Sequence, residues 1–300
     1  MIGIKVVLCF LVKGDEFELG TTLQVFQEVG GLGLIVAKNP TRTLDYYASD
    51  FPSIGPDIAA PGVNILAAIP PEETPYEFKS GTSVAAPHIS GIVALLKSLH
   101  PHWTPAAIKS ALVTTAWQTD PHSGEPILAE GNTNKIVDPF DFGGGLVNAN
   151  GAKDPGLVYD MGESNYVFNY LCPMGYNTSA IGSIINGYVT CALKMPSILD
   201  FNLPSLTIPS LKDTVTISRT VTNVGPMNSK YKSIIEPPAG ITIKVKPETL
   251  IFNSNTKKIS FTLTISTTHK YTTGYYFGSL TWTDGVHRVR SPISLRTEFP

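Results

Sequence analysis

The chain has 300 residues with a formal net charge of −2, of which 42% are hydrophobic and 15% charged. This length allows about two domains of ~100–200 residues each. The balanced charge excludes the basic footprint of a nucleic-acid-binding protein and a polybasic membrane-binding patch. No apolar run approaches the ~18 residues of a membrane span, so the composition predicts a soluble globular protein without nucleic-acid or membrane partners.

The first 38 residues predict a strand, a helix and a second strand. The apolar run over residues 1–14 is interrupted by Lys5 and Lys13, has no basic leader and is followed by no small-residue cleavage site. It therefore predicts a short buried strand rather than a signal peptide. A partly helical spacing follows from residue 20, and the apolar residues 32–37 predict the second buried strand.

Residues 57–116 have an α/β pattern, in which residues 65–68 predict a short strand. From Ser83 to Leu99, apolar residues recur on one face at helical spacing, which predicts a long helix. Thr104 and Pro105 predict the start of a second helix, because threonine caps helix N-termini and proline suits the first helical position.

The pattern changes after about residue 160, where a short helix is predicted over residues 166–171 and strand signals dominate from residue 196. Residues 259–265 alternate strictly between apolar and polar side chains, as a half-buried strand does. Asp284-Gly285 predicts a hairpin turn between two further strands. Several short strands separated by turns predict a β-sandwich of about 100 residues.

The chain has three cysteines. Cys172 and Cys191 lie close together in a turn-rich stretch, whereas Cys9 lies in an apolar run. With the secreted type of protein indicated below, we predict a Cys172–Cys191 disulfide, with Cys9 buried and free. The alternative is two ordinary buried thiols, as in a reducing compartment. Asn177, in the triplet Asn-Thr-Ser between the two cysteines, is the only candidate N-glycosylation site.

The stretch SGTSVAAPH at residues 80–88 carries the chemistry. Ser83 opens the long apolar helix after a tight approach through Gly81 and Thr82. Its hydroxyl is therefore expected to lie exposed beside the backbone N–H groups and the positive dipole end of that helix. A serine that attacks a carbonyl needs this field, because negative charge develops on the oxyanion. For an isolated serine before a helix, the alternative is a simple N-cap of a core helix.

The longer string GTSVAAPHISG at residues 81–91 resembles the nucleophile motif of the subtilisin family of serine proteases. Four more blocks are similar to plant members of that family: PDIAAPGVNILAA at 56–68, LHPHWTPAAIKSAL at 99–112, DFGGGLVN at 141–148 and DPGLVYD at 154–160. Residues 4–38 resemble part of the protease-associated insert of plant subtilases. The chain from about residue 196 resembles their C-terminal fibronectin type III-like domain, with VTNVG at 221–225 as its marker.

This resemblance implies an α/β remnant of a subtilisin-like parallel-sheet catalytic domain followed by an all-β fibronectin type III-like sandwich. The implied parts are a partial protease-associated insert (1–40), the C-terminal part of the catalytic domain (41–160), a connecting segment with the cysteine pair (161–195) and the fibronectin-like domain (196–300).

The resemblance also implies a serine endopeptidase that acts on polypeptides outside the cell, in the apoplast or cell wall. Ser83 would be its nucleophile, and Gly81 and Thr82 would belong to the substrate-binding site. No metal and no organic cofactor is implied, and the chain shows no cluster of carboxylates or of His and Cys at ligand spacing.

In this family the catalytic Asp and His and the oxyanion Asn precede the insert, and the chain contains no block of those types. Residues 39–54 also depart from the family pattern. We therefore expect a truncated protease that is inactive as an isolated chain. His88 is not expected to act as a substitute base, because it follows Ser83 by five positions on one helix and points away. Two alternatives are a non-catalytic remnant that contacts a partner through residues 196–300, and a subunit completed in trans by a missing half.

Overall fold

The computed structural model describes residues 5–10, 31–37, 56–70, 75–129, 135–192 and 196–299. Its first two strands, β1 (Lys5–Phe10) and β2 (Gly31–Ala37), pair in parallel. Both strands predicted in this region are therefore present. The helix predicted between them, residues 39–54 and the surroundings of the Cys9 side chain lie outside what the structure describes.

Three helices form the centre of the first half: α2 (Thr82–Leu99), α3 (Pro105–Thr114) and α5 (Ala149–Lys153). Their core contains Leu96, Ala107, Ile108, Ala111, Leu112, Ala152 and Val158. Helix α3 begins as predicted, since Thr104 Oγ1 accepts a hydrogen bond from the backbone N–H of Ala107 at 3.0 Å and Pro105 takes the first helical position. Both predicted helices are thus confirmed, and α2 starts one residue earlier than expected.

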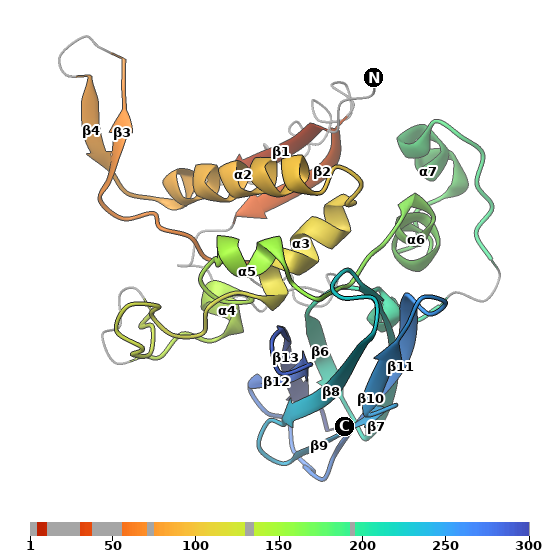
Figure 1. Ribbon diagram of the computed structural model, residues 1–300. Coiled ribbons are helices and arrows are strands. Elements are labelled where there is room, and N and C mark those ends of the chain that lie inside the picture. Colours follow the sequence, from red (N-terminus) through yellow and green to blue (C-terminus); the bar gives the residue numbers. More distant parts are fainter. Residues whose placement is uncertain are drawn as a thin grey trace.

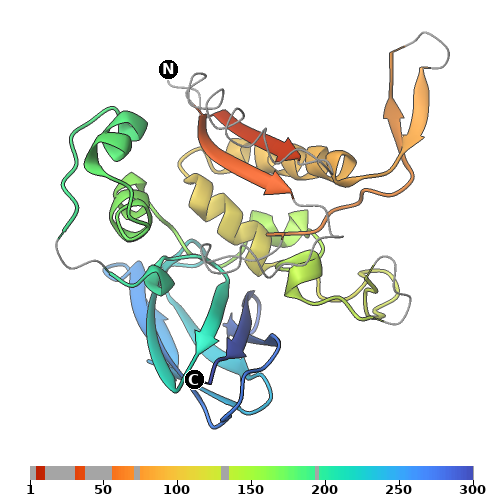
Figure 2. The ribbon, with the colours of Figure 1, turned by 180° about the vertical axis from the view of Figure 1, so that it is seen from behind.

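Helix α2 buries only part of its apolar surface within the chain. Leu96 is buried, whereas Leu95 and Leu99 are 65% and 55% exposed. Strands β1 and β2 run alongside α2, and α3 and α5 lie on another side of it (Figures 1 and 2). By length and composition α2 is the one helix of the described residues that could cross a membrane, a criterion that core helices of soluble proteins also meet.

Three consecutive glycines allow backbone segments of the first half to cross at close range. Gly143–Gly145 follow the one-turn helix α4 (Pro139–Phe142). A Cβ atom at these positions would lie 2.3, 2.4 and 2.2 Å, in that order, from the carbonyl oxygens of Pro56, Val113 and Trp117. Real Cβ atoms essentially never approach this closely. The three glycines are therefore required for these backbone segments to pack together.

The second half is a two-sheet β-sandwich preceded by the short 3₁₀ turn η3 (Ile198–Asp200). Its strands are β6 (Leu206–Leu211), β7 (Thr214–Asn223), β8 (Ser229–Glu236), β9 (Ile241–Lys246), β10 (Thr249–Phe252), β11 (Lys258–Thr267), β12 (Tyr276–Thr283) and β13 (Arg288–Thr297). One sheet has the order β10-β8-β12-β13-β6, and the other has the order β5-β7-β11-β9, where β5 is Leu157–Val158. The predicted alternation is confirmed in β11, where Phe261, Leu263 and Ile265 are buried, and β12 and β13 form the predicted hairpin around Gly285.

Strand β5 joins the helical half to the sandwich. It pairs antiparallel with β7, with Leu157 beside Asn223. Because successive side chains of a strand point to opposite faces, Leu157 and Tyr159 enter the sandwich core while Val158 enters the helical core. The buried Tyr159 hydroxyl also accepts a hydrogen bond from Ser291 Oγ at 2.9 Å. The two halves therefore share this segment.

Candidate active site

Ser83 lies in the first turn of α2, just after a protruding hairpin. The hairpin consists of β3 (Ile65–Ala68), which was predicted, and β4 (Tyr76–Lys79), which was not. Figures 1 and 2 show it extending beyond the start of α2. The N–H of Gly81 donates to the carbonyl of Gly62 at 2.7 Å, and a Cβ at Gly62 would lie 2.9 Å from the Gly81 carbonyl oxygen. The backbone at Gly62 therefore packs closely against the backbone at Gly81, where α2 begins.

The Ser83 hydroxyl is exposed and makes no hydrogen bond within the described part of the chain. Gly81, at φ 151°, is the N-cap residue, and its carbonyl accepts from Val84 N at 3.0 Å and Ala85 N at 3.2 Å. The N–H groups of Thr82 and Ser83 have no such partner among the described residues. They lie at the positive end of the helix dipole, where a developing negative charge is stabilised. The predicted site residues Gly81, Thr82 and Ser83 are therefore adjacent at one helix end.

No histidine is placed to take the proton of Ser83, although all six lie among the described residues. His88 contacts the carbonyl oxygen of Val84 through Nδ1 at 3.1 Å, so its ring turns back along its own helix. His100 stacks on Trp103 with ring centroids 3.8 Å apart. The remaining histidines are His102, His122, His269 and His287, and none of them bonds to Ser83.

Two carboxylates of the first half are engaged by side chains of α3 or its N-cap. Asp57 forms an ion pair with Lys109 at 2.7 Å, and Asp160 accepts a hydrogen bond from Thr104 at 2.5 Å. Within the described ranges, no three His, Cys, Asp or Glu side chains gather in a way that could hold a metal ion. The part of the chain that the structure describes therefore supplies an exposed hydroxyl and helix-terminal N–H groups at Ser83, and no general base beside them.

The cysteines and the glycosylation candidate lie in a separate small unit. Cys172 and Cys191 are joined by a disulfide, with Cα atoms 5.7 Å apart. The unit contains α6 (Glu163–Tyr166), the π-helical turn η2 (Val167–Leu171) and α7 (Thr178–Ile185). The predicted short helix thus starts three residues earlier, at Glu163. Sequence patterns gave no sign of α7, whose N-cap is Asn177.

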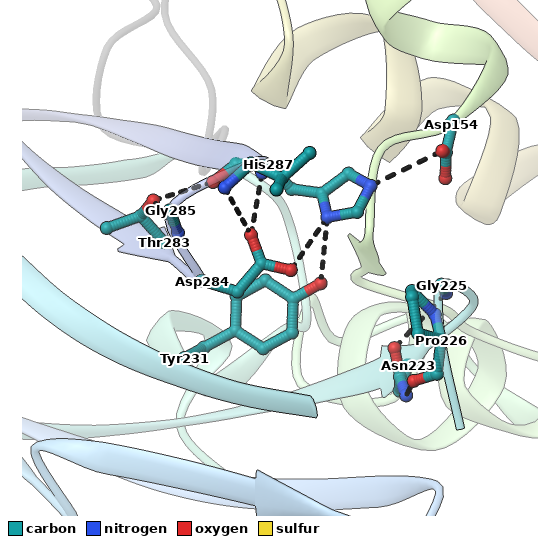
Figure 3. Close-up of polar contacts among 10 residues, drawn as sticks. Asp154, Asn223, Gly225, Pro226, Tyr231, Thr283, Asp284, Gly285 and His287 are labelled. Atoms are coloured by element: carbon teal, nitrogen blue, oxygen red, sulfur yellow. Dashed lines mark hydrogen bonds and ion pairs between the residues drawn. The ribbon is translucent and has the colours of Figure 1, made fainter. Parts of the chain in front are cut away.

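One polar cluster was missed altogether by sequence reasoning. His287 is nearly buried between Asp284 and Asp154 (Figure 3). Its partner Asp154 lies more than 130 positions earlier in the chain, so no local sequence pattern could have paired them.

Comparisons with known proteins identify relatives of both halves of the chain. The profile of the Subtilase family matches residues 35–153, and that of a Fibronectin type-III domain matches residues 200–295. The subtilisin-like protease SBT3.2 of Arabidopsis thaliana is 53% identical over 304 residues, which cover 95% of this chain and 41% of that protein. The subtilisin-like protease SBT3.4 of the same plant is 47% identical over 354 residues, covering 98% of this chain and 46% of that protein.

The chain therefore spans less than half the length of these relatives. Its 300 residues are also fewer than the 354 aligned positions of SBT3.4, so that relative has residues inside the aligned region that this chain lacks. Among solved structures, a family 123 glycoside hydrolase from Clostridium perfringens aligns with a TM-score of 0.26 at 16% identity, over 33% of this chain and 24% of that chain. A likeness this weak carries no structural inference.

A segment that matches the Subtilase family, followed by a fibronectin type III sandwich, places the chain in the class of subtilisin-like proteins. The chain belongs to the plant subtilisin-like proteases, the subtilases. The fold class inferred from the sequence is thereby confirmed.

Proposed function

We propose that Ser83 is the nucleophile of a secreted serine endopeptidase that cleaves extended polypeptides. The observation that carries this proposal is the exposed, unbonded hydroxyl of Ser83 at the N-terminus of α2, inside the segment that matches the Subtilase family. Both related proteins are named as proteases, in keeping with a polypeptide substrate.

In this proposal Ser83 Oγ attacks the scissile carbonyl, and the Ser83 N–H faces the oxygen on which negative charge develops. Gly81 and Thr82 offer backbone groups to the substrate beside the nucleophile. A base must take the hydroxyl proton, and nucleophile and base must lie within about 3 Å of each other. The described residues place no base there. In this proposal, residues outside this chain supply the His, the Asp and the oxyanion amide, and the 300 residues alone are inactive.

The alternative is a non-catalytic module that binds a protein through residues 196–300. It is favoured by one observation: the sandwich has a large core of its own, which includes Leu157 and Tyr159 but no residue of the Ser83 site. Completion in trans by a second chain is a further alternative. It predicts that activity appears when the chain is mixed with the missing half.

The first test uses a fluorophosphonate probe, which labels an activated serine covalently. We expect strong labelling at Ser83 in the complete protein, located by peptide mass spectrometry, and no labelling of the 300-residue chain. Strong labelling of the short chain that Ser83→Ala abolishes would show that it contains its own base. A complete protein that folds but does not label would favour the binding module.

We also propose that Asn177 carries an N-linked glycan in the secreted protein. Asn177 is exposed, and its Oδ1 accepts from the Ala180 N–H at 2.7 Å as the cap of α7, which leaves the reactive Nδ2 without a partner in the described structure. The neighbouring Cys172–Cys191 disulfide fits an oxidising compartment.

For the complete protein secreted from a eukaryotic host, intact-mass spectrometry should show a glycan that Ser179→Ala removes. This variant destroys the acceptor triplet but keeps the Asn177 cap. Thr178→Ala is the matched control, because it changes the triplet's middle residue and should keep the glycan. An unmodified Asn177 peptide from the wild-type protein would contradict the prediction.

A further inference from the structure

We propose that His287 is a proton-operated latch that holds the chain segment after α5 against the β12–β13 hairpin of the sandwich. The latch is defined by His287 and the two carboxylates that contact its ring, Asp154 and Asp284. One carboxylate belongs to the sandwich and the other to the subtilase-type half, so the ring bridges the two halves of the chain (Figure 3).

The geometry shows a ring with a carboxylate oxygen beside each of its two nitrogens. His287 Nδ1 lies 2.8 Å from Asp284 Oδ2, and His287 Nε2 lies 3.3 Å from Asp154 Oδ2. Only the protonated imidazolium can donate from both nitrogens at once. The side chain of His287 is 9% exposed and that of Asp284 13%, whereas that of Asp154 is 68% exposed. The contact to Asp154 is therefore the one that solvent can break.

On the hairpin side, hydrogen bonds hold Asp284 and His287 in place. The latch therefore opens at the contact with Asp154. The Asp284 carboxylate accepts from the backbone N–H groups of Val286 at 2.9 Å and His287 at 2.7 Å. Thr283 Oγ1 donates to the His287 carbonyl at 2.7 Å. Asp154, by contrast, ends α5 and has no other side-chain contact among the described residues. Loss of the His287 proton releases Asp154 while the hairpin keeps its shape.

The segment that follows Asp154 packs tightly against the His287 ring. Gly156 has φ 76°, and a Cβ there would lie 2.5 Å from the Tyr231 hydroxyl and 2.8 Å from His287 Cγ. Its carbonyl accepts from Val224 N at 2.9 Å and Gly225 N at 3.1 Å. The Gly225 N–H also donates to Asn223 Oδ1 at 3.1 Å, so the Val224 N–H is the group that reports whether the segment is docked.

The charged and titratable groups that face His287 are Asp154, Asp284 and Tyr231, from three different elements. Burial alone would lower the pKa of His287, but hydrogen bonds to Asp284 and Asp154 outweigh burial and raise it above 6.5. Burial would likewise raise the pKa of Asp284, but the His287 ring and the two N–H groups lower it to about 2. Burial raises the pKa of Tyr231, so its hydroxyl stays neutral throughout.

These directions set the pH window of the latch. A raised histidine pKa contributes stability that is fully present below 6.5 and is lost as the pH rises through the folded-state pKa. A lowered Asp284 pKa contributes stability that is present above 3.8 and is lost as the pH falls toward 2. The latch is thus closed between about pH 4 and 6.5 and loosens at higher pH. For each pKa unit by which His287 differs between the closed and the open latch, the equilibrium constant between closed and open changes by about tenfold across the titration.

The test is amide hydrogen exchange of Val224 in the 300-residue chain, corrected for intrinsic rates, between pH 5.5 and 8. Protection in the wild type should fall as the pH rises. In His287→Gln, which cannot take up a proton, protection should be low and independent of pH. Asp154→Asn should make protection depend less on pH. Because Asp154 is exposed, this substitution should leave the fold intact. His102→Gln, an exposed histidine outside the cluster, should keep the wild-type profile.

A histidine NMR titration gives a second measurement that does not depend on His287→Gln folding. His287 should titrate above 6.5, and Asp154→Asn should lower its midpoint. The proposal is overturned if His287 titrates at or below 6.5, or if Asp154→Asn and wild-type chains have the same exchange profile.

Discussion

Replacing Ser83 by alanine in the complete protein is expected to lower kcat/KM for peptide hydrolysis by about 10⁴-fold or more. The reason is that Ser83 is the proposed nucleophile, and its hydroxyl stands exposed and unbonded in the first turn of α2. Because the methyl group of alanine fits the same exposed position, folding and KM should change little. The measurement is steady-state kinetics with a fluorogenic peptide, alongside circular dichroism to establish that the variant is folded.

Ser90→Ala is the matched control for this experiment. Ser90 is also an exposed serine on α2, but its hydroxyl donates to the Ala86 carbonyl at 3.1 Å and lies two turns from the helix N-terminus. Its loss should leave kcat/KM within about threefold of wild type, since exposed surface changes away from special features have small effects. If Ser83→Ala and Ser90→Ala have equal activity, Ser83 is not the nucleophile.

Much of this site and fold could be predicted from short-range patterns. The Thr104-Pro105 cap, the alternation in β11 and the Asp284-Gly285 turn each depend on neighbouring residues, and the structure confirms all three. The exposed position of Ser83 followed from the glycine before it and the apolar helix after it. These features are encoded within about ten residues of sequence, where helix and strand periods are informative.

Features that depend on distant partners could not be predicted in this way. Strand β5 is two residues long, and only its pairing with β7 makes it part of the sandwich. The His287 cluster joins groups from three elements that the sequence keeps far apart. Strand β4 lacks the buried alternation of a core strand, because its residues are all exposed in the protruding hairpin. Helix α7 has Gly182 in its interior, which weakens its helical pattern.

Replacing Trp282 by alanine is expected to destabilise the sandwich by about 3–5 kcal/mol. Trp282 is fully buried on β12, in one sheet, and its ring meets Phe261 of the other sheet edge-on, with centroids 5.0 Å apart and planes at 70°. Its removal therefore leaves a cavity between the two sheets and also removes an aromatic pair, which is worth about 0.5–1.5 kcal/mol beyond the buried area. Urea unfolding of the 300-residue chain, followed by far-UV circular dichroism, measures the loss.

The control is Ile251→Ala, in which a large apolar side chain of β10, an edge strand of the same sheet, is 60% exposed. It should cost well under 1 kcal/mol, because little apolar area returns to water. Since Leu157 and Tyr159 belong to the same core as Trp282, the Trp282→Ala variant should also expose the segment between the two halves to proteolysis. A variant that lost stability without faster cleavage there would show that β5 is held by the helical half instead, through Val158.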